Sequence, residues 1–126
     1  MRHAMLLPLL LAACVTQTED QPYYWKLVSI DGQPFAANAT LAIDTDKGRA
    51  FGQAPCNRWT GQIETDPFPE WRIRKVAATM MACDKLAEEQ VFFAAMQAMT
   101  HQAVGLGHLE LVDQKGREMK FVPVTP

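Results

Sequence analysis

Short runs in which apolar and polar residues alternate, each followed by a turn-forming sequence, dominate the chain from Tyr23 onward. The first run, residues 23–30, is rich in aromatic and β-branched residues and ends at Asp31-Gly32, a strong signal for a hairpin or loop. Similar runs predict further strands at 41–44, 49–53, 59–64, 71–76, 106–112 and 119–122. Strands this short, separated by turns, are typical of an antiparallel barrel or sandwich.

One segment, residues 84–100, has the period of a helix instead. At about 100° per residue, its apolar residues share one broad face, formed by Leu86, Phe92, Phe93, Met96 and Met99. Asp84 is the expected N-cap, and the acidic residues that follow it suit the positive end of the helix dipole. The predicted fold is therefore mainly β with one α-helix, a small antiparallel barrel-like domain.

Glu89 falls inside the apolar face of this helix and not opposite it. Because burying an unpaired carboxylate is costly, Glu89 must either lie in solvent through rotation of the helix or find a partner. The candidate partners are Asn57, Arg58 and backbone N–H groups near Thr79. A functional carboxylate is a third, less favoured interpretation.

The composition is that of one ordinary globular domain. The chain has 126 residues, of which 48% are hydrophobic and 21% charged, and its formal net charge is −2. No run of Lys or Arg forms a basic stripe along the sequence, so we expect no nucleic-acid binding. No apolar stretch reaches the roughly 20 residues that a membrane-spanning helix needs.

The N-terminus has the sequence features of an export signal peptide. Arg2 and His3 precede the apolar run 4–11, and Leu11-Ala12-Ala13-Cys14 resembles the bacterial lipobox, in which the cysteine after the cleavage site is lipidated. We therefore expect a lipoprotein signal peptide at 1–13, lipidated Cys14 with a flexible tether at 14–22, and the folded domain at 23–123. An ordinary secretory leader with an incidental cysteine is the alternative.

Lipid on Cys14 implies attachment to a bacterial membrane. The residue after the cysteine is Val15, where an aspartate would resemble the signal for inner-membrane retention, so the periplasmic face of the outer membrane is the expected location. Several acyl chains on one cysteine give effectively permanent anchoring.

Two cysteines, Cys56 and Cys83, then remain for the folded domain in an oxidising compartment. We expect a disulfide between them. Two buried free thiols are the alternative, and a metal site is less favoured because neither cysteine has a second cysteine or histidine at ligand spacing.

The sequence offers little for catalysis, and no cofactor or metal is expected. His3 lies in the leader, His101 and His108 stand alone, and Ser29, the one serine, lacks the glycines of a nucleophile elbow. No phosphate-binding loop, zinc motif or EF-hand spacing is present. An enzyme is therefore the least favoured class.

A binding surface is the favoured function class, with Arg58, Trp59, Trp71, Arg72 and Arg74 as candidate residues because Trp and Arg are frequent at binding hot spots. The alternative places both tryptophans in the core, which strand alternation favours. That alternation puts Trp71, Ile73 and Lys75 on one face of their strand.

Several spaced motifs resemble a known family. They are Trp25-x-Leu27; Gly52-x-x-x-Cys56-Asn57 with Trp59 and Gly61; Thr79-x-Met81-Ala82-Cys83 with Glu89 six residues on; and Leu109-x-Leu111, Gly116 and Phe121. In this order and spacing they resemble the META domain, the family that includes the HslJ-like heat-shock proteins. The resemblance covers residues 23–122. One departure is Pro55, where the family usually has glycine; proline cannot adopt a positive φ, so the local turn must differ.

The resemblance implies an exported, β-rich domain associated with stress tolerance, drug tolerance, or motility and secretion, with no agreed enzymatic reaction. We therefore expect a monomeric, non-enzymatic lipoprotein that acts in envelope stress or antibiotic tolerance by binding a protein partner or a small ligand. The alternatives are protein binding like that of lysozyme inhibitors, or a purely structural role in the envelope.

Overall fold

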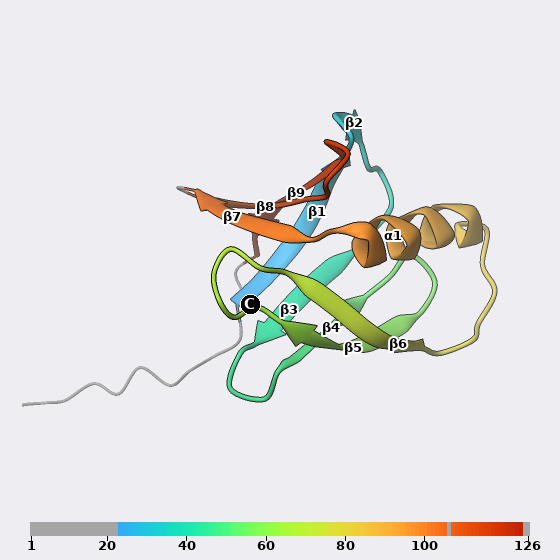
Figure 1. Cartoon of the computed structure of the whole chain (residues 1–126). Helices are drawn as coiled ribbons and strands as arrows, with labels where there is room; N and C mark the ends of the chain where they lie inside the picture. The colour runs from blue at the N-terminus through green and yellow to red at the C-terminus, as the bar shows by residue number, and fades with distance from the viewer. Residues whose placement is uncertain (1–22, 106, 125–126) are drawn as a thin grey trace, which may run out of the picture.

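The computed structural model describes residues 23–105 and 107–124, which form one curled antiparallel sheet and one helix (Figure 1). The elements in chain order are β1 (Tyr23–Ile30), β2 (Gln33–Pro34), β3 (Thr40–Asp44), β4 (Arg49–Gln53), β5 (Arg58–Glu64), β6 (Arg72–Ala78), α1 (Leu86–Ala98), β7 (His101–Gly105), β8 (His108–Val112) and β9 (Glu118–Pro123). The fold is thus mainly β with one helix, a half-barrel, as the sequence predicts.

The sheet is continuous in the order β6-β5-β4-β3-β1-β9-β8-β7, with the short β2 paired to β1. Tight turns join most neighbours: Asp31 and Gly32, both at positive φ (52° and 79°), connect β1 to β2. β1 lies between β3 and β9, so the first and last strands of the domain are paired. The pairing extends beyond β9, where the Val124 N–H donates to the Tyr24 carbonyl at 2.9 Å.

The two ends of the sheet meet at one corner. Glu70 and His101 form an isolated bridge, and the Trp71 N–H donates to the Thr100 carbonyl at 3.0 Å. The Gln102 N–H donates to the Pro69 carbonyl at 2.8 Å. α1 lies across the remaining open side of the curl, next to β6 (Figure 1).

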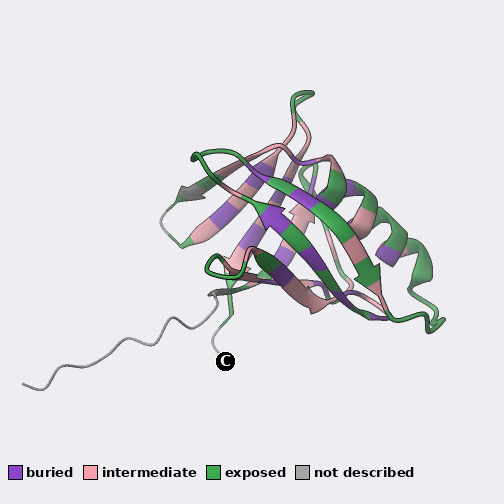
Figure 2. Ribbon diagram, turned by 60° about the horizontal axis from the view of Figure 1, so that its bottom comes forward, coloured by how far each residue is buried: buried purple, intermediate pink, exposed green. Residues whose placement is uncertain are grey.

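The core fills the concave side of the sheet. Buried and exposed positions alternate along the strands (Figure 2), and β5 follows this pattern over its whole length. Trp59 packs edge-on against Phe92 and Phe93 of α1, with ring centroids 6.1 and 6.4 Å apart. This contact of sheet with helix is part of the apolar cluster.

Gly52 on β4 lies close to the backbone of Thr40 on the neighbouring strand β3. A Cβ at this position would overlap the backbone carbonyl of Thr40, and the same carbonyl accepts the Trp59 indole N–H at 3.2 Å. A glycine within a strand often marks such a close backbone approach.

The helix is shorter than predicted and begins differently. It spans Leu86–Ala98, and Lys85 is the N-cap residue, without a side-chain hydrogen bond. Asp84 as N-cap was therefore a wrong prediction: it lies one residue too early, in the turn that follows Cys83. Leu86, expected on the apolar face, is exposed at the first position of the helix.

The alternation in β6 changes phase at a bulge. Trp71 and Ile73 face the core as predicted, but Lys75 has a φ of +54° and is exposed. The pairing of β6 with β5 shifts register here, so that the half-buried Val76 takes the inward position predicted for Lys75. The inward placement of Lys75 was wrong for this reason.

Two strands were missed by the sequence analysis. β2 consists of two residues, too few for a period. β7 follows directly on the segment predicted as helix (84–100) and was assigned to no element; it pairs along its whole length with β8.

The predicted signal peptide (1–13), Cys14 and the tether (14–22) lie outside the described residues. Within the described part of the chain, no helix is long and apolar enough to cross a membrane.

Candidate functional site

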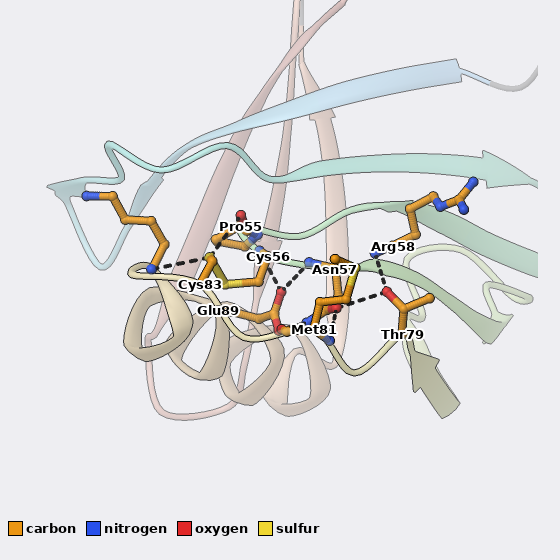
Figure 3. The surroundings of a disulfide bond; sticks show 9 residues. Pro55, Cys56, Asn57, Arg58, Thr79, Met81, Cys83 and Glu89 are labelled. Carbon is orange, nitrogen blue, oxygen red and sulfur yellow. Dashed lines mark hydrogen bonds between the residues drawn. A yellow bond between two sulfur atoms is a disulfide. The ribbon is translucent and has the colours of Figure 1, made fainter.

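The predicted disulfide is present and joins the sheet to the segment before the helix. Cys56, in the turn between β4 and β5, bonds to Cys83, two residues before Lys85 at the helix N-cap (Figure 3). The bond closes the chain around β5 and β6. The loop from Thr79 to Lys85, here the 79–85 loop, is thereby tied to the β4–β5 turn close to its C-terminal end.

Asn57, next to the disulfide, ties the start of the same loop. Its side-chain NH2 donates to the Met81 carbonyl at 3.0 Å and to Glu89 Oε2 at 2.7 Å. Its side-chain oxygen accepts from the Thr79 hydroxyl at 2.9 Å and from the Met81 N–H at 2.7 Å. Asn57 is buried and uses both its donors and both its acceptor positions, and only this orientation of the amide satisfies all four partners.

Glu89 completes the cluster from the first turn of α1. It is only 4% exposed, and its Oε1 accepts the N–H groups of Cys56 and Asn57, each at 2.9 Å. Oε2 accepts from the Asn57 amide. The buried carboxylate is therefore compensated by three hydrogen bonds and by its place near the helix N-terminus.

The structure decides between the interpretations of Glu89. It does not lie in solvent, and Asn57 is its side-chain partner, as predicted among the candidates. The backbone donors belong to residues 56–57 and not to the region of Thr79. Arg58 is not a partner: its side chain is exposed and extends away from the carboxylate (Figure 3).

The turn at Pro55 needs no positive φ. The Ala54 N–H donates to the Asn57 carbonyl at 2.7 Å, and none of the four described residues 54–57 has a positive φ. Pro55 lacks an N–H, and the next two N–H groups both point to Glu89. Proline in place of the family's glycine is thus accommodated by a turn without positive φ, whose Cys56 and Asn57 N–H groups donate to Glu89 on the helix.

The 79–85 loop, although held in this way, presents apolar side chains to solvent. Met80 is 95% exposed and Met81 is 68% exposed. The Met81 backbone is fixed by two hydrogen bonds to Asn57, and the Thr79 N–H donates to the Arg58 carbonyl at 3.0 Å. Met81 entered the sequence-based predictions only as part of the family motif, because an apolar residue between strand and helix carries no local sign of exposure.

The two candidate tryptophans are core residues, as strand alternation favoured. Trp59 and Trp71 are each 1% exposed. The Trp71 indole N–H is the one buried side-chain polar atom without a hydrogen-bond partner among the described residues. Neither tryptophan can contact a partner directly, so their selection as binding residues was wrong.

The candidate arginines lie on the convex face of the sheet. Arg58, Arg72 and Arg74 are exposed, and Arg74 is 3.6 Å from the Glu64 carboxylate. They lie outside the Asn57–Glu89 cluster, so the structure separates the predicted site residues into a buried cluster and an exposed basic face.

The two histidines in the described part of the chain contact different neighbours. His101 contacts the Thr100 hydroxyl at 2.9 Å, and His108 lies 3.6 Å from Glu110 on the β8 surface. A shallow hollow lies between the β1–β2 and β8–β9 turns, where Asp31 accepts the Glu118 N–H and pairs with Arg117. Among all residues that the structure describes, no three or more metal-ligating side chains lie together.

Comparison with solved structures supports the fold. The chain is similar to an NMR structure of a protein from Burkholderia xenovorans, with a TM-score of 0.64 and 20% identity over 95% of this chain and 100% of that one. It is also similar to a second protein solved by NMR, with a TM-score of 0.60 and 20% identity over 81% of this chain and 90% of the other. At this identity the likeness shows the fold alone.

None of the curated proteins compared with the chain matches it. The family model for the META domain matches residues 18–125, nearly the whole chain. The match confirms what the spaced motifs around Cys56, Cys83 and Glu89 predicted. The chain belongs to the META domain family.

Proposed function

We propose that this chain is a non-enzymatic binding protein of the bacterial envelope, attached by lipid on Cys14 to the periplasmic face of the outer membrane. Its role is tolerance of envelope stress or antibiotics, exerted through a bound protein or small ligand. The lipobox-like sequence before Cys14 supports the anchor, and membership of the META family supports the association with stress.

The observation that carries the binding role is the exposure of Met80 and Met81 on a loop that is held rigidly. A disulfide, both functional groups of Asn57 and a buried carboxylate fix the backbone of the 79–85 loop. A fixed loop loses little conformational entropy when a partner binds, which favours affinity. Methionine is frequent at protein-binding surfaces because its flexible thioether adapts to the partner.

The saturation of the cluster supports a non-enzymatic role. Asn57 has no free donor or acceptor, and Glu89 is enclosed by hydrogen bonds within the domain. A general acid or base must reach the proton of a substrate, and neither side chain can do so without breaking the contacts that fix the loop. The cluster supports the loop and does not act on a substrate.

Photo-cross-linking in intact cells tests the proposal. A photoreactive amino acid replaces Met80, whose side chain is almost fully exposed, and adducts are isolated after irradiation. The matched control carries the same amino acid at Gln114, an exposed position in the β8–β9 turn. We expect a defined adduct from position 80 and none from position 114.

The same experiment separates the alternatives. A lysozyme as the cross-linked protein would favour the inhibitor-like function. Equal adducts from both positions, or none from position 80 in a folded and exported protein, would overturn the proposed binding role and favour a structural one. Loss of membrane attachment in Cys14→Ser is the expected result for the anchor; a variant that stays attached would refute it.

A further inference from the structure

The fold brings together basic residues that are dispersed along the sequence. The convex face of β4, β5 and β6 carries five exposed cationic side chains, here the basic face: Arg49, Arg58, Arg72, Arg74 and Lys75. Arg49 and Arg74 flank Gln62 on its two neighbouring strands, which places their backbones about 10 Å apart. The bulge at Lys75 turns its side chain outward and adds it to this group.

Two carboxylates lie beside these five cations: Glu64, 3.6 Å from Arg74, and Asp44, which is opposite Arg49 in the register of β3 and β4. Three more exposed carboxylates, Asp46, Asp66 and Glu70, lie in the adjoining turns and not on the strands. The whole sequence has 14 Asp and Glu against 12 Lys and Arg, so a concentration of five cations leaves the rest of the domain acidic. The domain is therefore polarised, with one positive face on a molecule of net negative charge.

This face also adjoins the point where the chain enters the domain. β1 starts at Tyr23, which is paired with Ile43 near the end of β3, beside the Asp44–Arg49 pair. Cys14 lies nine residues before Tyr23 in the sequence. A fully extended chain of nine residues is about 30 Å long. A lipid on Cys14 would keep this end of the domain within that reach of the membrane.

Aromatic side chains border the basic face on the same side. Tyr24, 38% exposed, lies edge-on to Phe51 with ring centroids 6.3 Å apart. The Arg49 guanidinium lies 5.5 Å from the centre of the Phe51 ring. Tyrosine is favoured at the level of lipid headgroups, where its ring meets apolar surroundings and its hydroxyl meets water.

We propose that the basic face docks on the anionic headgroups of the membrane that holds the chain. This proposal rests on the proposed anchor at Cys14. An anionic bilayer attracts basic side chains within about one Debye length, roughly 8 Å at physiological salt, and a short tether holds the domain at high effective concentration there. Docking would fix the orientation of the domain, with the basic face toward the lipid.

The occupant follows from the place of the face and not from its charge alone. An acidic protein would match the charge equally well, but nothing would require its site to lie beside the tether or to be bordered by Tyr24. The position of Arg49, Arg72 and Arg74 at the end of the sheet where the tether joins favours the membrane.

Arginine modification on vesicles tests the proposal. The full chain, purified with its lipid, is incorporated into vesicles of phosphatidylcholine alone or of phosphatidylcholine with phosphatidylglycerol. Phenylglyoxal then modifies accessible arginines, and mass spectrometry measures each site. We expect protection of Arg49, Arg58, Arg72 and Arg74 on the anionic vesicles only, and its loss at 1 M salt, where the Debye length falls to about 3 Å.

Charge-neutral variants sharpen the result. Arg72→Gln/Arg74→Gln should weaken docking by about 25-fold, at about fivefold for each cation removed near the surface, and should leave Arg49 and Arg58 open to modification. The matched control, Lys85→Gln/Lys115→Gln, makes the same change in net charge at exposed sites off the face and should keep the protection. Thermal unfolding shows that both variants fold.

The outcomes separate docking from anchoring. Vesicles that carry the protein but leave all arginines equally reactive with both lipid mixtures would overturn the docking. Protection only in native membranes that contain other proteins would also overturn it and favour an acidic protein as the occupant. A Cys14 peptide without added lipid mass, and no flotation with phosphatidylcholine, would refute the anchor; protection on anionic vesicles would still support the docking.

Discussion

Replacing Glu89 with glutamine changes one atom of a buried side chain, yet we expect this substitution to destabilise the domain strongly. Oε1 would still accept the N–H groups of Cys56 and Asn57, at 2.9 Å each, but without charge assistance. The new NH2 group would replace Oε2, which now lies 2.7 Å from the Asn57 NH2 group, so that a donor would face a donor. The reversed amide is worse, because its NH2 would face two backbone donors.

The magnitude follows from these contacts. A hydrogen bond to a charged group contributes about 1 kcal/mol more than a neutral one, and a buried polar group left without a partner costs about 1–3 kcal/mol. Two weakened bonds and one donor–donor contact therefore give a loss of about 3–5 kcal/mol. For a domain of this size the melting temperature should fall by at least ~12 °C.

The second half of the prediction is a rescue. Asn57→Asp alone places a second carboxylate against Glu89 and is also strongly destabilising. The double variant Asn57→Asp/Glu89→Gln restores a donor–acceptor pair and the original charge, and only the contact with the Met81 carbonyl, at 3.0 Å, becomes unfavourable. We expect a coupling energy of at least ~2 kcal/mol in the double-mutant cycle.

Urea unfolding at one pH, with the disulfide intact, measures the cycle. Glu88→Gln is the matched control: it lies in the same helical turn and shares the effect of the helix dipole, but accepts none of these hydrogen bonds, and should cost less than about 0.5 kcal/mol. The reasoning is refuted if Glu89→Gln costs no more than Glu88→Gln, or if the two single losses add to the double loss within about 0.5 kcal/mol.

Three further predictions concern the same fold. Cys56→Ala/Cys83→Ala should lower the free energy of unfolding by about 3.6 kcal/mol, the loop-entropy value for the segment that the bond closes, and reduction of the wild type should match it in urea unfolding. The pKa of Asp31 is lowered, first by the backbone N–H it accepts and then by Arg117, so its carboxylate stabilises the fold above the unfolded pKa of about 3.9. That stability is lost as the pH falls through the lower folded pKa. Below about pH 4 the urea midpoint of Asp31→Asn should therefore fall less steeply with pH than that of the wild type. Equal slopes for the two proteins would contradict this. Gly52→Ala should cost about 3 kcal/mol or more, because the added Cβ overlaps a backbone carbonyl of β3, whereas a cost below about 1 kcal/mol would mean that β3 and β4 can separate.

The local period of the sequence predicted most of the sheet. Alternation along residues 59–64 placed Trp59 in the core, because side-chain direction in a strand depends only on the neighbouring residues. It failed after Ile73 because one residue, Lys75, adopts a positive φ and inserts a bulge. No pattern in the sequence marks that lysine, which lies where the pairing of β6 with β5 shifts register.

The buried cluster was half predictable. The helical period indicated that Glu89 lies on the apolar face, and the cost of burying a carboxylate required a partner. Asn57 was one of the predicted candidates. The period could not choose between Asn57 and Arg58, because that depends on how α1 docks on the sheet. The exposure of Met80 was not predictable, because it depends on the path of a loop whose next residue, Met81, is held by the Asn57 side chain through a contact distant in sequence.

Because β1 is paired on one side with β9, the order in which the chain becomes available limits when the domain can fold. A chain delivered N-terminus first, from a ribosome or through a translocation pore, offers β1 about 90 residues before its partner β9. Contacts this distant in sequence form slowly, and until then β1 has one unpaired edge. The sheet is therefore complete only when the last strand, β9, has paired with β1. Residues 24 and 124 then lie together, so that a circular permutant could join the two ends of the domain and begin in an exposed turn.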